Sequence, residues 1–408
     1  MNYKHLAANR QKLLAFFPQI VYNLGDLHAK GTRMNIKEIA EIKKRFNAEK
    51  SNISRIRGCC INEKKEIIST FDQSLNLMSL EESEEVLSLL KKTLSGSLGR
   101  NLIDIAFTNN QVLDSDEHRL LTAVRNSCLA DDEAVNLLFD RIRESYISEG
   151  NYLILLASDS YDVPAYSSDG AKKGDSAGIY TYFLCAICPV KMTKSTLGYR
   201  MVEHQLRNNT PDWVIAPPQA GFLFPAFDGR TANIYNVLFY TRDTADNREE
   251  LVDALFKSTV PMPAAEQKQV FGTLIRDTIA EELSMEVVKT VQEQIGTMIE
   301  EHKALKDPDP LVVSKHTVSD LLRGCGVEES RIDTFAEKFD ETFGAKAEVL
   351  PENLLNVKQL EVKTPDVSIR LSAETSDLVE TRIIDGQKYI MIRAEGTVEV
   401  NGVEISIT

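Results

Sequence analysis

NYLILLAS (residues 151–158) and IYTYFLCAICPV (residues 179–190) decide the fold, because they are the most apolar runs in the chain. Short apolar runs bounded by polar turn residues are typical of buried strands. We therefore predict two core strands. The polar, glycine-containing segment YSSDGAKKGDSAG lies between them and predicts a loop or a hairpin excursion.

Helix-start signals lie on both sides of these strands. Ser79 followed by Glu82 forms a capping box, and Asn247 followed by Glu250 predicts the start of another helix. The other elements that we predict before Val260 are a β-hairpin over 53–70, a strand over 102–107, and helices near 115–127 and 131–148.

The pattern changes after PMPAAEQ (261–267). Helical periodicity predicts helices near 264–282, 285–304, 315–323 and 328–343. From Leu360 the period becomes two. IIDGQKYIMI and VEVNGVEISI each place an Asp-Gly or Asn-Gly pair between β-rich arms, which is the strongest short signal for a β-hairpin.

These patterns predict an α+β protein in three parts. We expect a mixed α/β N-terminal domain over 34–260, a helical middle segment over 261–345, and a small antiparallel C-terminal sheet of hairpins over 346–408. Residues 1–33 are interpreted as a misassigned leader, with translation starting at Met34. The alternative for 1–33 is an amphipathic helix.

Composition restricts the class of protein. The 408 residues are 43% hydrophobic and 26% charged, as in ordinary globular proteins. No apolar run approaches the length of a membrane-spanning helix, and the first residues lack the pattern of a signal peptide. Six scattered cysteines without an export signal indicate reduced thiols, so we expect a cytoplasmic protein with no membrane contact.

Charge is unevenly distributed along the chain. Residues 1–33 carry net +4 and residues 34–65 carry net +5, which leaves −23 on the rest of a chain whose total is −14. The basic residues of the second stretch form a candidate nucleic-acid-binding set: Lys43, Lys44, Arg45, Lys50, Arg55, Arg57, Lys64 and Lys65. A solvated charged surface is the alternative. Because the remainder is acidic, we expect phosphate contact over a small area only.

The segment 221–256, GFLFPAFDGRTANIYNVLFYTRDTADNREELVDALF, is a second candidate for function. It places polar groups among apolar residues, where they need partners or a ligand. The candidate residues are Asp228, Arg230, Asn233, Tyr235, Tyr240, Arg242 and Asp243.

Cys185 and Cys188 form a CxxC, but in a strand this odd spacing points the two side chains to opposite faces. The same holds for Cys59 and Cys60. No other cysteine or histidine stands at ligand spacing, so we expect core cysteines, no metal and no cofactor. None of the hydrolase, phosphate-loop or dinucleotide-binding motifs occurs, and we assign no catalytic residue.

Long motifs carry a family resemblance over 34–408. They are NISRIRGCCINEKKEII, TLSGSLGRNLIDI, EGNYLILLASDSYDVP, GFLFPAFDGRTANIYN, YTRDTADN, VPMPAAEQ and LVETRIIDGQKYI. On these motifs the chain resembles a family of Gram-positive bacterial proteins that is described only as a domain of unknown function. Members of that family tend to begin at the position of Met34, which agrees with the interpretation of 1–33.

A more distant resemblance is to the 37 kDa bacterial nucleoid-associated proteins. It is carried by the order of elements in YNVLFYTRDTADNREELVDALF, VSKHTVSDLLRGCGVEESRIDTFAEKF and DLVETRIIDGQKYIMI. The resemblance implies a non-enzymatic cytoplasmic protein that associates with the nucleoid or with a nucleic-acid-processing complex. Two other functions stay open: a protein-interaction adaptor without nucleic acid, and an enzyme with a site around Asp228–Asp243.

Overall fold

The computed structural model describes residues 33–166, 172–345, 347–394 and 396–406. Residues 34–408 form one unit that is separate from 1–33. The interpretation of 1–33 as a leader or an amphipathic helix therefore falls outside the described residues, except at Arg33.

The two apolar runs form the centre of an antiparallel sheet, as the sequence predicts. They lie within β4 (Tyr152–Tyr166) and β5 (Lys172–Met192), which pair with each other. The path of the sheet is β2-β1-β4-β5-β9-β12-β3, and β8 (Trp213–Ile215) pairs with the far end of β5. The other strands are β1 (Arg55–Ile61), β2 (Ile67–Ser74), β3 (Leu102–Ala106), β9 (Ala220–Phe224) and β12 (Asn236–Thr241).

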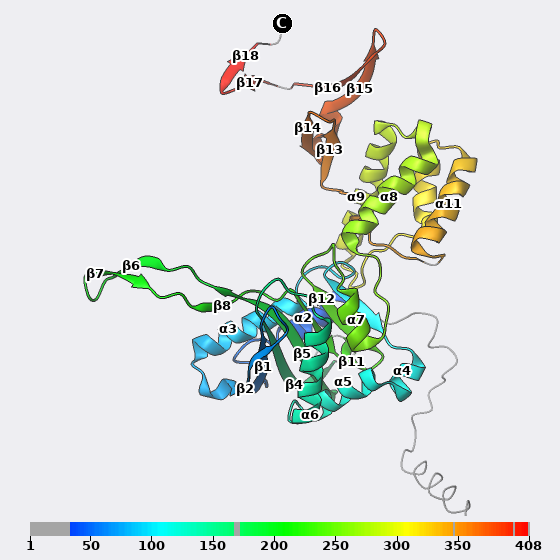
Figure 1. Ribbon diagram of the computed structural model, residues 1–408. Helices are drawn as coiled ribbons and strands as arrows, with labels where there is room; N and C mark the ends of the chain where they lie inside the picture. The colour runs from blue at the N-terminus through cyan, green and yellow to red at the C-terminus, as the bar shows by residue number, and fades with distance from the viewer. Residues whose placement is uncertain (1–32, 167–171, 346, 395, 407–408) are drawn as a thin grey trace, which may run out of the picture. The chain divides into compact units, whose positions relative to one another are not determined.

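Helices cover both faces of this sheet (Figure 1). One face packs against α5 (Asp116–Asn126), α6 (Asp132–Ser145) and α7 (Glu249–Phe256). The opposite face packs against α2 (Ile36–Lys43) and α3 (Leu80–Lys91). Cys185 belongs to the first core and Cys188 to the second, which confirms that the CxxC residues point to opposite faces. Burial raises the pKa of Cys188 to about 12.

Short elements complete the first part of the chain. They are η1 (Leu75–Leu77), η2 (Lys92–Leu94), α4 (Asn109–Asp114), and the hairpin strands β10 (Ala226–Asp228) and β11 (Thr231–Asn233). The capping box of Ser79 and Glu82 is confirmed, since Ser79 Oγ accepts from Glu82 N and Glu82 Oε2 accepts from Ser79 N.

The predicted cap at Asn247 is wrong. α7 begins at Glu249, and Arg248 occupies the N-cap position with φ 53° and no capping side chain. Asn247 is buried and its Nδ2 donates to Pro261 O at 2.6 Å. The side chain thus serves a main-chain carbonyl of the next connection, which local sequence spacing does not reveal.

The helical part contains α8 (Ala264–Ile279), η3 (Ala280–Glu282), α9 (Met285–Leu305), α10 (Lys315–Gly324), α11 (Glu329–Phe343) and α12 (Pro351–Leu354). Its core gathers the apolar stripe of α11, including Ile332, Phe335 and Phe339, with residues of the other helices. Gly344 follows α11 at φ 101°, a conformation that favours glycine.

The C-terminal hairpins are confirmed, and each is a separate two-stranded ladder in the described residues. Asp385-Gly386 and Asn401-Gly402 form their turns with positive φ at all four residues. The elements are β13 (Gln359–Lys363), β14 (Ser368–Ser372), η4 (Ala373–Leu378), β15 (Val379–Ile384), β16 (Gln387–Ile392), β17 (Val398–Val400) and β18 (Val403–Ile405). The α+β class is confirmed.

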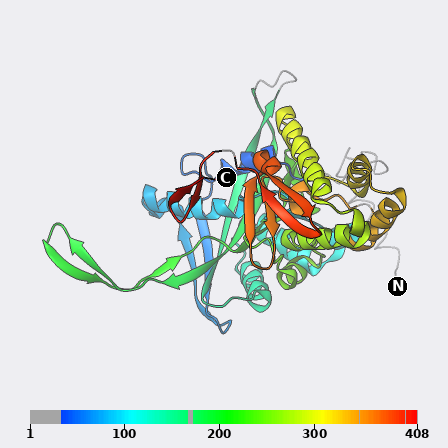
Figure 2. The same cartoon turned by 90° about the horizontal axis from the view of Figure 1, so that it is seen from above.

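A hairpin after β5 is among the elements that were not predicted. After β5 the chain forms a hairpin of β6 (Thr196–Arg200) and β7 (Gln205–Asn209), and returns through β8. Figure 2 shows this ladder as two strands with no third strand beside them. We call residues 191–215 the arm.

Candidate functional site

A pocket of 320 Å³ lies between the end of α2 and β4. Its lining consists of Lys37, Glu41, Lys44, Arg45, Lys50, Tyr161 and Pro164. Four of these seven residues are cations and one is a carboxylate, so the lining has a formal charge of +3 on an acidic chain. We call it the cationic pocket.

α2 positions two of the lysines. Asn35 and Glu38 cap this helix reciprocally, and Ile39 and Ile42 bury its apolar face. Lys37 and Lys44 are seven residues apart, which is two helical turns, so both lie on the side of the helix that faces the pocket. A lysine at a helix C-terminus is favourable in itself and explains Lys44. It does not explain why Lys37 and Lys50 line the same pocket.

Arg45 is held by a buried carboxylate. Its Nε donates to Asp159 Oδ2 at 3.0 Å, and the Asp159 side chain is fully buried. Tyr182 Oη donates to the same oxygen at 3.1 Å. Burial, more than the neighbouring Asp159, raises the pKa of Tyr182 well above its usual value, so this hydroxyl stays protonated and remains a donor.

The guanidinium of Arg45 also lies over the ring of Tyr161, 4.9 Å from its centroid. Its Nη2 is buried and has no hydrogen-bond partner among the described residues. Oδ1 of Asp159 is likewise buried without a partner, so the ion pair forms only one of the two hydrogen bonds that a guanidinium and a carboxylate can make.

Glu41 is the one carboxylate of the pocket lining, and it already accepts hydrogen bonds from Arg230 and Tyr161. Arg230 donates to both of its oxygens, at 3.1 and 2.9 Å, and Tyr161 Oη donates to Oε1 at 2.8 Å. Burial opposes ionisation of Glu41, but the hydrogen bonds from Arg230 and Tyr161 outweigh it and lower its pKa. The carboxylate thus stays ionised and paired.

The lysines of the pocket are different. Lys37, Lys44 and Lys50 are exposed, and none has an ion pair with another residue in the described part of the chain. Lysine ammonium groups act as hydrated point charges that suit phosphate. The pocket can therefore hold an anion.

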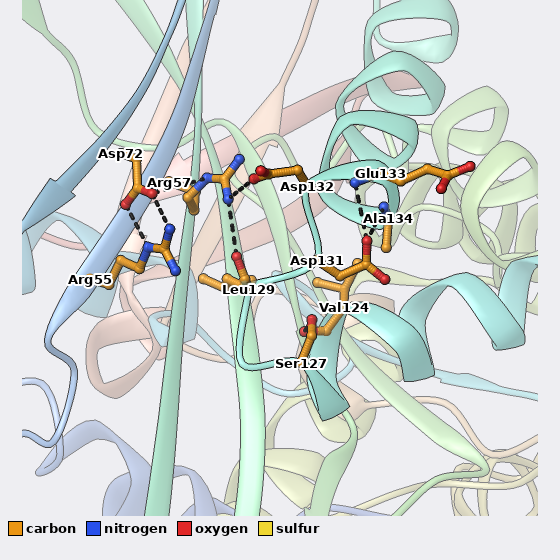
Figure 3. A network of polar contacts seen from close by, with 10 residues as sticks. All are labelled: Arg55, Arg57, Asp72, Val124, Ser127, Leu129, Asp131, Asp132, Glu133 and Ala134. Carbon is orange, nitrogen blue, oxygen red and sulfur yellow. Dashed lines mark hydrogen bonds and ion pairs between the residues drawn. The ribbon is translucent and has the colours of Figure 1, made fainter.

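The remaining cations of the predicted set have other environments. Figure 3 shows Arg55 and Arg57 of β1. Arg55 Nε donates to Asp72 Oδ1 at 2.6 Å, and Arg57 Nη1 donates to Leu129 O at 3.1 Å and to Asp132 Oδ1 at 2.7 Å. Arg57 thereby ties β1 to the connection between α5 and α6, where Asp131 caps α6.

The three remaining lysines of the predicted set lie outside the cationic pocket. Lys65 Nζ donates to Glu144 O at 2.6 Å. Lys43 is half-buried and does not line the cationic pocket; burial, and then Lys91, lowers its pKa. Lys64 is exposed in the β1–β2 turn. Of the predicted set, only Lys44, Arg45 and Lys50 meet at the pocket.

The residues of the second candidate segment separate into two groups. Asp228, Arg230, Asn233 and Tyr235 lie on or next to the β10–β11 hairpin, before β12. There Asn233 Nδ2 donates to Asp228 Oδ2 at 3.2 Å, and Arg230 reaches Glu41.

Tyr240, Arg242 and Asp243 lie at the other end of β12. Tyr240 is buried, whereas Arg242 and Asp243 are exposed, and Asp243 Oδ1 accepts from Ala245 N within a turn. The five residue steps from Tyr235 to Tyr240 span roughly 17 Å along β12, so the segment does not form one site.

Sequence reasoning missed Lys37, Glu41, Asp159 and Tyr161. The signal for Lys37 was its seven-residue spacing from Lys44. The signal for Asp159 was a carboxylate directly after the apolar run of β4, because a buried charge requires a partner.

Residues 34–403 match the family described as Domain of unknown function (DUF4317), and the chain belongs to this family. No curated protein matches the chain. None of the helices in the described ranges has the length and apolar composition that a membrane crossing requires.

Proposed function

We propose that this is a non-enzymatic bacterial cytoplasmic protein that associates with nucleic acid, at the nucleoid or in a nucleic-acid-processing complex, by holding backbone phosphate in the cationic pocket. The observation that carries the proposal is the convergence of Lys37, Lys44 and Lys50, all exposed and without ion pairs among the described residues, beside Arg45. The similarity in element order to the nucleoid-associated proteins supports the same class.

Nucleic acid fits this pocket because three of its four cations are flexible lysines. Lysines neutralise phosphate without fixing its geometry, so they favour a repeated backbone over one specific small molecule. The acidic remainder of the chain repels a long duplex, which limits the contact to a few phosphates. We therefore expect weak binding that does not depend on base sequence, with a Kd of about 10⁻⁵ M at physiological salt.

The test measures binding of the full chain to fluorescently labelled single-stranded DNA, duplex DNA and RNA by anisotropy at several salt concentrations. We expect log Kd to rise with log salt concentration with a slope of about 3, as for three to four neutralised phosphates. Scrambled sequences of the same length should bind equally.

The variant inside the pocket is Lys44→Glu/Lys50→Glu. The control outside the pocket is Lys64→Glu. The pocket variant should lose most of the binding, and Lys64→Glu, on an exposed turn of the same basic stretch, should keep it. Equal losses in both variants would instead assign binding to the whole basic surface. No binding by the wild type at low salt would overturn the proposal in favour of the adaptor function.

A further inference from the structure

The arm exposes apolar residues on one face of the β6–β7 ladder and in its turn, since Leu197 lies two residues from Tyr199, which is paired with Leu206. Its most exposed apolar side chains are Leu197 (67%), Met201 (78%), Val202 (95%) and Leu206 (67%). β6 and β7 pair only with each other, and an isolated two-stranded hairpin is marginally stable in water. Exposure of this kind on a hairpin marks an interaction surface.

The arm is also basic. It contains Lys191, Lys194, Arg200 and Arg207 against Glu203 and Asp212, which gives net +2 on a chain of net −14. Arg207 pairs with Glu203 at 3.1 Å. Lys191 and Lys194 are exposed and have no ion pair with another described residue, so they are the cations available to a partner.

A surface of matching character lies at the start of α3. Leu77 and Leu80 are 88% and 67% exposed, although both are large apolar residues. Glu81, Glu84 and Glu85 follow on exposed positions of the first turns of α3. Positions three and four apart share a helix face, so these carboxylates form one acidic rim beside the two leucines.

We propose that the arm of one copy of this chain docks on the start of α3 of a second copy, so that two copies form a twofold dimer. Leu197 and Leu206 would cover Leu77 and Leu80, while Lys191 and Lys194 would meet Glu81 and Glu84. The contact occurs twice in such a dimer, which closes it and prevents chain-like polymerisation. The ten residues from Lys191 to Arg200 span about 33 Å as an extended strand, which is long enough to reach beyond the parent sheet.

A second copy fits the arm better than nucleic acid does. Leu197, Met201, Val202 and Leu206 are all at least 67% exposed on the arm, and phosphate does not cover apolar surface. The chain itself supplies a surface with the complementary apolar and acidic character. This inference is independent of the cationic pocket, because no residue is shared.

The test is a charge exchange followed by sedimentation equilibrium of the full chain. We expect the wild type to be a dimer. Lys191→Glu/Lys194→Glu places two acidic surfaces together, and Glu81→Lys/Glu84→Lys places two basic ones together. Each variant alone should dimerise at least about tenfold more weakly. An equimolar mixture should recover wild-type dimerisation, because both contacts of the mixed dimer are then complementary.

The mixture also controls for folding, since it contains only the two weakened proteins. A chain that carries all four substitutions should dimerise by itself. If the chain with four substitutions dimerises and the mixture does not, the arm contacts α3 of its own chain. That result would overturn the proposed dimer. A monomeric wild type, or arm variants that lose DNA binding with unchanged mass, would also overturn it.

Discussion

Two groups of basic residues come from the same stretch of sequence, residues 34–65, and have opposite environments. Around the cationic pocket, Lys37, Lys44 and Lys50 are exposed and lack ion pairs with the described residues. On β1, Arg55 and Arg57 are engaged by Asp72, Asp132 and Leu129 O. Net charge along a sequence therefore predicts neither binding nor stability. The partner of each cation decides its role.

Arg45 combines the two environments, because it lines the pocket and is also held by Asp159. Its side chain is 15% exposed and that of Asp159 is fully buried. The pair fixes one cation, and the lysines around it remain available. The substitutions below test this division, beginning with the one that should cost the most stability.

Asp159→Ala should lower the free energy of unfolding by about 3 kcal/mol, because it leaves the largely buried guanidinium of Arg45 without its anion. It also removes the acceptor of Tyr182 Oη. Urea denaturation of the wild type and the variant measures the difference. A loss below about 0.5 kcal/mol would show that the carboxylate does not hold Arg45.

Arg57→Leu should lower the free energy of unfolding by about 2 kcal/mol, since Arg57 is buried and serves Leu129 O together with Asp132. Arg55→Leu is the matched control on the same strand. Its pair with Asp72 is solvent-exposed, so we expect a loss below about 1 kcal/mol. Equal losses of unfolding free energy would show that the buried contacts of Arg57 stabilise the fold no more than the exposed ion pair of Arg55 does.

The sequence predicted which residues form strands and helices better than it predicted their partners. Apolar runs identified β4 and β5, and odd spacing placed Cys185 and Cys188 on opposite faces, because both inferences depend on local geometry alone. The partner of Arg45 is 114 residues away and that of Arg57 is 75 residues away. Each pairing joins a strand residue to a residue at the end of a helix, so it depends on how the helices pack on the sheet, which no local pattern contains.

The arm shows the same limit in another form. Its turn, between Arg200 and Gln205, lacks the Asn-Gly or Asp-Gly pair that identified the hairpins of β15–β16 and β17–β18. Its apolar residues are not covered within the described chain, so they give no core pattern. Sequence reasoning misses this hairpin because it has neither a standard turn nor a buried face.

Glu41→Gln should lower the free energy of unfolding by about 1 kcal/mol at neutral pH, through weaker hydrogen bonds to Arg230 and Tyr161. The pKa of Glu41 is lower in the folded protein than its usual 4.5. The stability that its ionisation contributes is thus present above that value and lost as the pH falls through the folded-state pKa. Denaturation at several pH values should show the difference between wild type and variant shrinking in acid.

Glu38 provides the control with the opposite sign. Burial raises its pKa, despite the backbone hydrogen bonds from Asn35 and Arg230. Its ionisation therefore costs stability as the pH rises through the folded-state pKa. Glu38→Gln should gain stability relative to the wild type over that rise. The same pH trend in both variants would contradict the assignment of Glu41 as the paired carboxylate of the pocket.

Lys44→Ala/Lys50→Ala should change the free energy of unfolding least, by less than about 0.5 kcal/mol, because both side chains are exposed and neither has an ion pair with a described residue. Removing two like charges beside Arg45 relieves some repulsion, which offsets the weaker interaction of residue 44 with the end of α2.

The same variant should lower the salt slope of nucleic-acid binding by about 2, or 1 for each lost phosphate contact. Urea denaturation and the anisotropy titrations measure the two quantities on one protein. A stability loss comparable to that of Arg57→Leu would mean that the lysines serve the fold, and the contrast between the two basic groups would disappear. Unchanged stability with a reduced slope is the result that only a binding role produces.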